Sequence, residues 1–149
     1  AGLTSLLIPG TYFISESIVT DREKILDAVY TTAQAVEQND HQSAVVVIAD
    51  NVIRQRALDE LPKYEFHRIS VRNIQIKMVA GSLPPEATVD VDASARVSMV
   101  KGGMKNVPAL RRVILTFQKQ PDESWKVIDY THVSMTGQAD GLTPNRTTK

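Results

Sequence analysis

The sequence predicts an α+β domain in which helices come first and an antiparallel sheet follows. Apolar residues recur at helical spacing through much of the first 61 residues. From residue 66 to residue 135 they alternate with polar residues, and short turn sequences separate the alternating stretches. Strands with one solvent-exposed face need an apolar layer against the other face, and the helical part of the chain can supply it. We therefore expect N-terminal helices packed on one face of a curved antiparallel sheet of four or more strands.

The first helix is expected to begin at Thr20. Thr20 and Glu23 form a T-x-x-E capping box, in which the hydroxyl and the carboxylate bind free backbone amides at a helix start. Apolar side chains then repeat along one face as far as Val36. Asn39 can adopt the left-handed conformation that ends a helix, and Asp40 can cap the next one.

Two shorter helices are expected before Pro62. The first, within residues 41–50, is ambiguous because four successive β-branched residues would also suit a buried strand. The Asp40 cap favours a short helix there. The second, residues 52–61, has apolar residues one turn apart and ends where Pro62 blocks further helix.

Four strands are expected after the helices. Their ranges are residues 66–79, 87–100, 111–120 and 125–135. In the first of them the apolar residues change parity near Arg72 and Asn73, which predicts a bulge. Turn sequences at residues 82–86, 101–106 and 120–124 connect successive strands as hairpins.

The two ends of the chain are expected to lie outside the domain, which spans residues 20–136. Residues 1–19 are apolar, carry no charge before Glu16, and are too short and too interrupted to span a bilayer. They are either the remnant of a membrane anchor or signal that preceded Ala1, or an apolar arm packed on the domain. The first case implies a membrane-anchored or exported protein, and the second leaves a cytoplasmic one open. Residues 137–149 lack periodicity and are expected to form a disordered tail.

Charge and composition disfavour several functions. Lys plus Arg and Asp plus Glu number 17 each, so no overall field attracts nucleic acid, and we expect no such partner. The chain has no cysteine, which removes disulfides, thiolate metal sites and cysteine nucleophiles. Its three histidines form no H-x-H or H-E-x-x-H pattern. We expect no metal and no cofactor.

Two segments of the chain resemble one family. The stretch REKILDAVYTTAQAVEQNDHQSAVVVIADN, from Arg22, resembles the start of the nuclear transport factor 2-like superfamily, where a first helix ends near N-D and a short helix follows. The stretch DESWKVIDYTHV, from Asp122, is similar to the last strand of that superfamily. The resemblance implies a cone-like fold of the SnoaL-like, cystatin-like kind, with a pocket between the first helix and the sheet. The short segment before Phe66 departs from the family pattern and implies a shallower pocket.

Two functions remain open at this stage. The first is a non-catalytic module that binds a protein or forms a homodimer through the sheet face, as is common in proteins that it resembles. The scarcity of acid and base candidates favours it. The second is an enzyme of the isomerase or dehydratase kind, or a pocket for a small apolar ligand, with Asp129 as the base and Tyr130, His132 or Tyr64 as hydrogen-bonding partner.

Asp129 is the main catalytic candidate because a regular strand would point it to the buried side. Burial can raise the pKa of a carboxylate toward the range of a general base. A bulge in the strand, or an ion pair with an arginine such as Arg96 or Arg112, would make Asp129 structural instead. His132 has the opposite parity, beside Tyr130, and is expected to be solvated.

Overall fold

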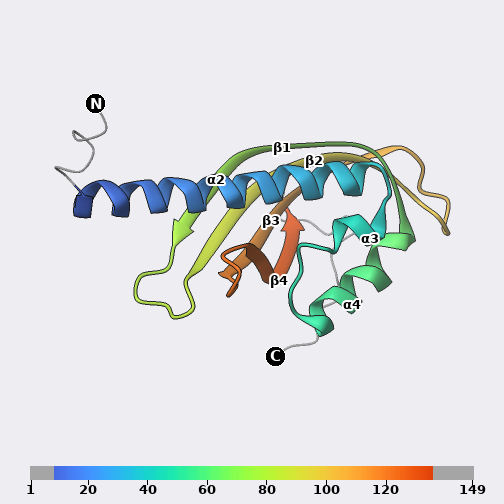
Figure 1. Cartoon of the computed structure of the whole chain (residues 1–149). Helices are drawn as coiled ribbons and strands as arrows, with labels where there is room; N and C mark the ends of the chain where they lie inside the picture. Colours follow the sequence, from blue (N-terminus) through green and yellow to red (C-terminus); the bar gives the residue numbers. More distant parts are fainter. Residues whose placement is uncertain (1–8, 136–149) are drawn as a thin grey trace.

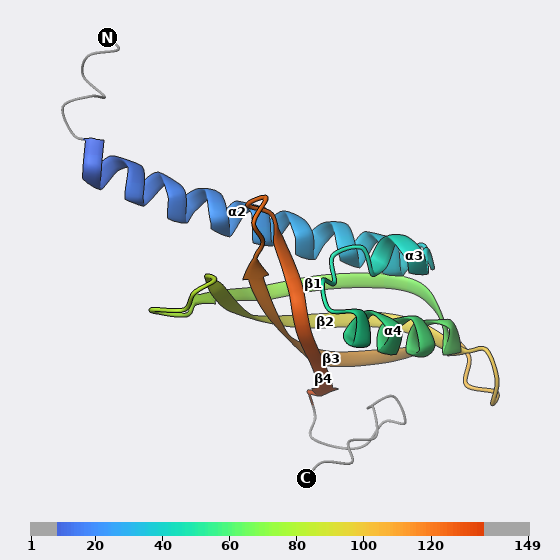
Figure 2. The ribbon, with the colours of Figure 1, turned by 60° about the horizontal axis from the view of Figure 1, so that its bottom comes forward.

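The computed structural model describes residues 9–135, with side chains from Thr20 onward. Its elements are α2 (Pro9–Glu37), α3 (His41–Ala44), α4 (Asn51–Glu60), the 3-10 helix η1 (Leu61–Lys63), β1 (Tyr64–Met78), β2 (Glu86–Met99), β3 (Val107–Lys119) and β4 (Trp125–Ser134). The strands form one antiparallel meander in the order β1-β2-β3-β4, and the helices cover one face of it, here called the inner face (Figures 1 and 2). The predicted α+β architecture is confirmed. The tail predicted for residues 137–149 lies outside the described residues.

The first helix begins earlier than the sequence predicts. α2 starts at Pro9, a residue suited to the first helical turn, so Thr20 and Glu23 lie in the helix interior. The capping-box prediction was wrong because the amides that such a box would bind are already bonded to the preceding turn of the helix. The first turns of α2 extend past the sheet (Figure 2). None of the helices in residues 9–135, α2 included, combines the length and apolarity needed to span a membrane.

Asn39 ends α2 and binds the open edge of β1. Its backbone adopts the predicted left-handed conformation, with φ of 58°. Its side-chain Oδ1 accepts a hydrogen bond from the Phe66 amide at 2.8 Å, and its Nδ2 donates to the Phe66 carbonyl at 2.9 Å. Glu37 accepts from the Ile69 amide at 2.9 Å. Side chains at the end of α2 thus satisfy backbone groups that β1 cannot pair with a strand.

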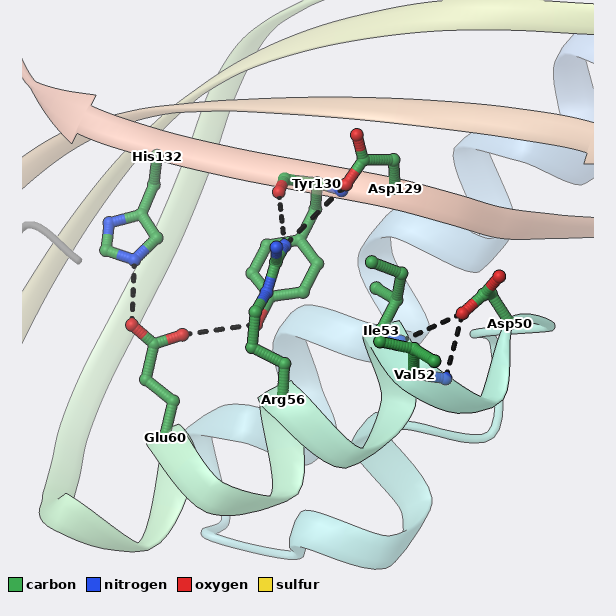
Figure 3. Close-up of polar contacts among 8 residues, drawn as sticks. All are labelled: Asp50, Val52, Ile53, Arg56, Glu60, Asp129, Tyr130 and His132. Carbon is green, nitrogen blue, oxygen red and sulfur yellow. Dashed lines mark hydrogen bonds and ion pairs between the residues drawn. The ribbon is translucent and has the colours of Figure 1, made fainter. Parts of the chain in front are cut away.

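An aspartate caps each of the two shorter helices. The Asp40 carboxylate accepts from the Ser43 amide at 3.2 Å, and the Asp50 carboxylate accepts from two amides at the start of α4 at 2.8 and 3.0 Å (Figure 3). The short helix predicted after Asp40 is confirmed, but it ends at Ala44. The ambiguous β-branched residues form a turn and a single bridge to β4. The third predicted helix is α4, and Pro62 follows it in η1.

The sheet is irregular at three places. The register of β1 against β2 shifts between Arg72 and Gln75, which confirms the predicted bulge, and Asn73 there has φ of 53°. A second shift in β1 lies between Phe66 and Arg68, where Asn39 binds the strand. A third shift lies where β3 pairs with β4.

The core is most tightly filled between α2 and the strand ends near the β3–β4 turn. The largest fully buried side chains come from α2, β2 and β3: Ile25, Val89 and Phe117. Trp125 is also buried, and its indole Nε1 donates to Asp21 of α2 at 3.1 Å. Lys119 forms an ion pair with the same carboxylate at 3.3 Å. These contacts fix α2 against the sheet.

Candidate functional site

A cavity of about 290 Å³ lies between α2, α4 and the inner face of the sheet. Its walls are mostly aliphatic, and small side chains line it on adjacent strands, including Ala93, Ala95 and Ala109. Because each of these alanines occupies an inward position where a larger residue would fill the core, the cavity is a consequence of the sequence of β2 and β3. Its volume is at the small end of ligand-binding pockets, which hold roughly 300–1,000 Å³.

Glu60 is the carboxylate in this cavity wall. It lies in the last turn of α4 and faces β4, where the Tyr130 hydroxyl donates to its Oε1 at 3.1 Å and His132 Nε2 lies 3.4 Å from its Oε2 (Figure 3). Burial raises the pKa of Glu60, but contacts with His132, Tyr130 and Arg56 together outweigh it, and the pKa lies below its ordinary value. Glu60 is therefore ionised at neutral pH.

Arg111 determines which nitrogen of His132 carries the proton. Arg111 is buried, with 7% of its surface exposed, and its Nη2 and Nε lie 2.8 and 3.2 Å from His132 Nδ1. A guanidinium can only donate hydrogen bonds, so Nδ1 must accept. The ring proton of the neutral imidazole is then on Nε2, which faces Glu60. His132 thus accepts from Arg111 through Nδ1 and faces Glu60 with Nε2, so it links the two residues.

Arg56 of α4 lies over Tyr130 of β4. Its guanidinium carbon is 4.5 Å from the centre of the Tyr130 ring, and its Nη2 donates to the Tyr130 carbonyl at 2.7 Å (Figure 3). Burial is the main cause that raises the pKa of Tyr130 to about 12; the hydrogen bond with Arg56 opposes this effect, and the charge of Glu60 adds to it. Tyr130 therefore keeps its proton and acts as a donor throughout the physiological range.

A bulge in β4 reverses the predicted orientation of the site residues. Ile128 has no partner in the pairing of β4 with β3, so it is an extra residue in the strand. Beyond it, Asp129 faces solvent with 64% of its side chain exposed, 3.7 Å from Arg56. Tyr130 and His132 line the cavity instead. The bulge left open from the sequence as the alternative for Asp129 is therefore present, with Arg56 rather than Arg96 or Arg112 as the nearby arginine. The solvated position predicted for His132 was wrong, because its side chain is only 19% exposed.

Three further residues line the cavity, and only one of them was predicted from the sequence as a site residue. Tyr64, the other predicted partner, lines the same cavity. Glu60 and Arg111 were not predicted as site residues from the sequence. Nothing in the pattern of α4 singles out Glu60, because its role depends on β4. Arg111 did carry a signal, because it shares the inward parity of Ala109 and Val113 and a charged residue on that face of a strand is unusual.

The described part of the chain contains no group of three or more histidine, aspartate or glutamate residues that could hold a metal ion. The expectation that the protein uses no metal stays a prediction.

Comparison with known proteins identifies the fold. No family model and no curated protein matches the sequence. A solved ketosteroid isomerase-like protein from Erwinia carotovora atroseptica is similar with a TM-score of 0.61 at 15% identity, over 76% of this chain and 95% of that one. A candidate aromatic ring hydroxylase from Novosphingobium aromaticivorans is similar with a TM-score of 0.61 at 14% identity, over 78% and 90%.

A third structure names the fold class. It is a candidate dehydratase of the NTF2-like family from Streptomyces avermitilis, with a TM-score of 0.54 and 12% identity over 78% of this chain and 97% of that one. At these identities the shared property is the fold. The chain therefore has the fold of nuclear transport factor 2-like proteins, as the resemblance of its two segments implied.

Proposed function

We propose that the protein binds a small, mostly apolar molecule in the cavity and catalyses a proton transfer of the isomerase or dehydratase kind. The observation that carries the proposal is the ionised Glu60 carboxylate, which Tyr130 and His132 hold in the wall of an otherwise apolar cavity. A concave apolar site with a few convergent polar groups and shifted pKa values is typical of small-molecule sites. The fold shared with an isomerase-like protein and a candidate dehydratase supports the same class.

Glu60 acts as the general base in this proposal. In the empty cavity its pKa is low, which makes it a weak base. Burial is the largest single influence on this carboxylate and acts to raise its pKa. A ligand that fills the cavity removes more water from Glu60, and this loss of water acts to raise the pKa toward the range of a useful base. The carboxylate then takes a proton from a carbon of the substrate, and that proton returns to another carbon or leaves with a hydroxyl as water.

The neighbours of Glu60 act as positioning residues. Tyr130 and His132 each donate to one carboxylate oxygen, which fixes the direction of the group. Arg111 holds His132 in the tautomer that makes this possible. Asp129, the base considered from the sequence, is exposed, and it binds Arg56 and the Tyr130 amide. We assign it a supporting role on the outside of β4.

The test uses a neutral β-hydroxyketone, 4-hydroxy-4-phenylbutan-2-one. Removal of a proton beside its carbonyl appears as deuterium incorporation in heavy water, and elimination of water yields the conjugated ketone, which absorbs in the ultraviolet. We expect the wild-type protein to accelerate either reaction over buffer and the Glu60→Gln variant to lose the acceleration. Asp129→Asn is the matched control and should retain it. An unchanged rate in Glu60→Gln contradicts the assignment of the base.

One observation favours the alternative of a self-associating module. Leu110, Val133 and Met135 are 47%, 40% and 43% exposed, and they lie together where β3 pairs with the end of β4, on the face opposite the cavity. Exposed apolar residues that adjoin one another are typical of protein interfaces. Under this alternative the protein is a homodimer through the sheet face, and sedimentation equilibrium should show a dimer that Leu110→Asp converts to a monomer. A wild-type monomer would contradict it.

A further inference from the structure

We infer that the ligand of the cavity is a neutral, mostly apolar molecule whose hydroxyl group donates a hydrogen bond to Glu60. This inference rests on the proposed function and specifies its substrate class. An alcohol or phenol fits, whereas a carboxylic acid or a molecule that can only accept hydrogen bonds does not.

The hydrogen bonds of Glu60 indicate a donor. An ionised carboxylate has about four acceptor positions. Tyr130 occupies one on Oε1 and His132 one on Oε2. The side chain of Glu60 is 21% exposed, so the remaining positions are accessible from the cavity that it lines. Only a hydrogen-bond donor can use them.

The same contacts disfavour a ligand that only accepts. The Tyr130 hydroxyl and the His132 Nε2 proton already bind Glu60, so a carbonyl or ether oxygen placed against Glu60 would have to take one of them from an ionised acceptor. Hydrogen bonds to a charged group are stronger than those to a neutral one. The exchange would therefore replace a stronger hydrogen bond with a weaker one.

The charges around the cavity disfavour an ionised ligand. Among the described residues, the cations Arg111 and Arg56 at the site lie close to the anions Glu60 and Asp129, with His132 between Arg111 and Glu60. An anionic group near the Tyr130 and His132 donors would lie beside the Glu60 carboxylate and be repelled by it. The rest of the wall is apolar except for Thr32 and Tyr64, and it offers an ionised group little compensation for lost water.

The experiment compares three probes that share a naphthalene frame: 2-naphthol, 2-methoxynaphthalene and 2-naphthoate. At pH 7 a phenol keeps its proton and a carboxylic acid does not. Amide chemical shifts of the labelled full chain measure each dissociation constant, and shifts at Ala93, Ala95 and Ala109 locate binding in the cavity. We expect 2-naphthol to bind about tenfold or more tightly than either of the other probes, as for one hydrogen bond to a charged acceptor.

Two variants serve as controls. Glu60→Gln replaces the charged acceptor with a neutral one of the same shape, and the preference for 2-naphthol over 2-methoxynaphthalene should shrink severalfold. Ala95→Leu places a larger side chain in the cavity wall and should weaken all three probes alike.

The possible outcomes separate this inference from the proposed function. Equal binding of 2-naphthol and 2-methoxynaphthalene in the cavity overturns the hydroxyl requirement but leaves a small-molecule site. Tightest binding of 2-naphthoate overturns the neutral-ligand inference and assigns the preference to Arg111. If no probe shifts the cavity amides, the inference and the small-molecule function fail together.

Discussion

The buried contact between Asp21 and Trp125 sets the position of α2, and its removal has a calculable cost. In Asp21→Ala the indole Nε1 loses the acceptor that it now has at 3.1 Å, inside a core where Trp125 is 4% exposed. A buried donor left without a partner costs about 1–3 kcal/mol. The ion pair with Lys119, whose side chain is 22% exposed, adds less than about 1 kcal/mol. We expect a total loss of about 2–3 kcal/mol in the free energy of unfolding.

Urea unfolding followed by circular dichroism measures this loss. With a slope of about 1–3 kcal/mol per molar urea, the midpoint should fall by about 0.7–3 M. Asp21→Asn is the matched control: it keeps an oxygen for Trp125 but loses the charge, so it should cost about 1 kcal/mol or less. Combining Asp21→Ala with Trp125→Phe should show a coupling of about 1 kcal/mol, because the second change removes the donor. If Asp21→Ala and Asp21→Asn are equally stable, the hydrogen bond does not hold the helix.

Three other predictions concern the pH dependence and the local structure of the site. Because the pKa of Glu60 is lower in the folded chain than its ordinary value, its ionised form stabilises the fold above that value, and this contribution is lost as the pH falls through the folded pKa. The difference in unfolding free energy between wild type and Glu60→Gln should therefore be smaller at pH 3 than at pH 7; an equal difference contradicts the shift. Asn39→Ala should be less stable in urea than Asn39→Gly by about 1 kcal/mol, because both lose the hydrogen bonds to Phe66 but only glycine adopts φ of 58° without strain. Asp50→Ala should cost about 1 kcal/mol through the lost cap of α4, and Asp50→Ser should restore most of it.

The strands could be predicted from the sequence because each depends on local information. Alternation marks the buried face, and glycine, proline and aspartate mark the turns. The start of α2 could not be predicted in the same way, because Thr20 and Glu23 match a capping box whether or not a helix precedes them. A local motif shows that a helix could start at a residue, and the residues upstream decide whether it does.

The site could be predicted only in part because its residues are distant in the sequence. Glu60 and His132 are 72 positions apart and meet only when α4 packs on β4. Tyr130 and His132 were selected from the sequence, but as partners of Asp129, on the wrong face of the strand. One residue caused this error: a single extra position in a strand exchanges the faces of all residues that follow it.

The bulge at Ile128 therefore explains why Tyr130 and His132 face Glu60, and deleting Ile128 tests the explanation. With Ile128 removed, Asp129 still pairs with Thr116, and β4 becomes a regular strand. Tyr130 should then stay inside, and its pKa, measured by ultraviolet titration, should stay near the value of about 12 that its burial produces.

If β4 kept a bulge at this place even without Ile128, the deletion would turn Tyr130 outward. Its pKa would then fall toward the ordinary value of 10.0, and the extra residue Ile128 would not be what directs these side chains into the cavity. Removing Tyr130 instead of Ile128 is the matched deletion. This deletion shifts His132 by one position, so its side chain should turn to solvent. The contact between His132 Nε2 and the Glu60 carboxylate should then be lost. Bulges are common next to functional sites because they change the direction in which side chains point. In this protein the side chains concerned are Tyr130 and His132, the donors that hold Glu60, the proposed base.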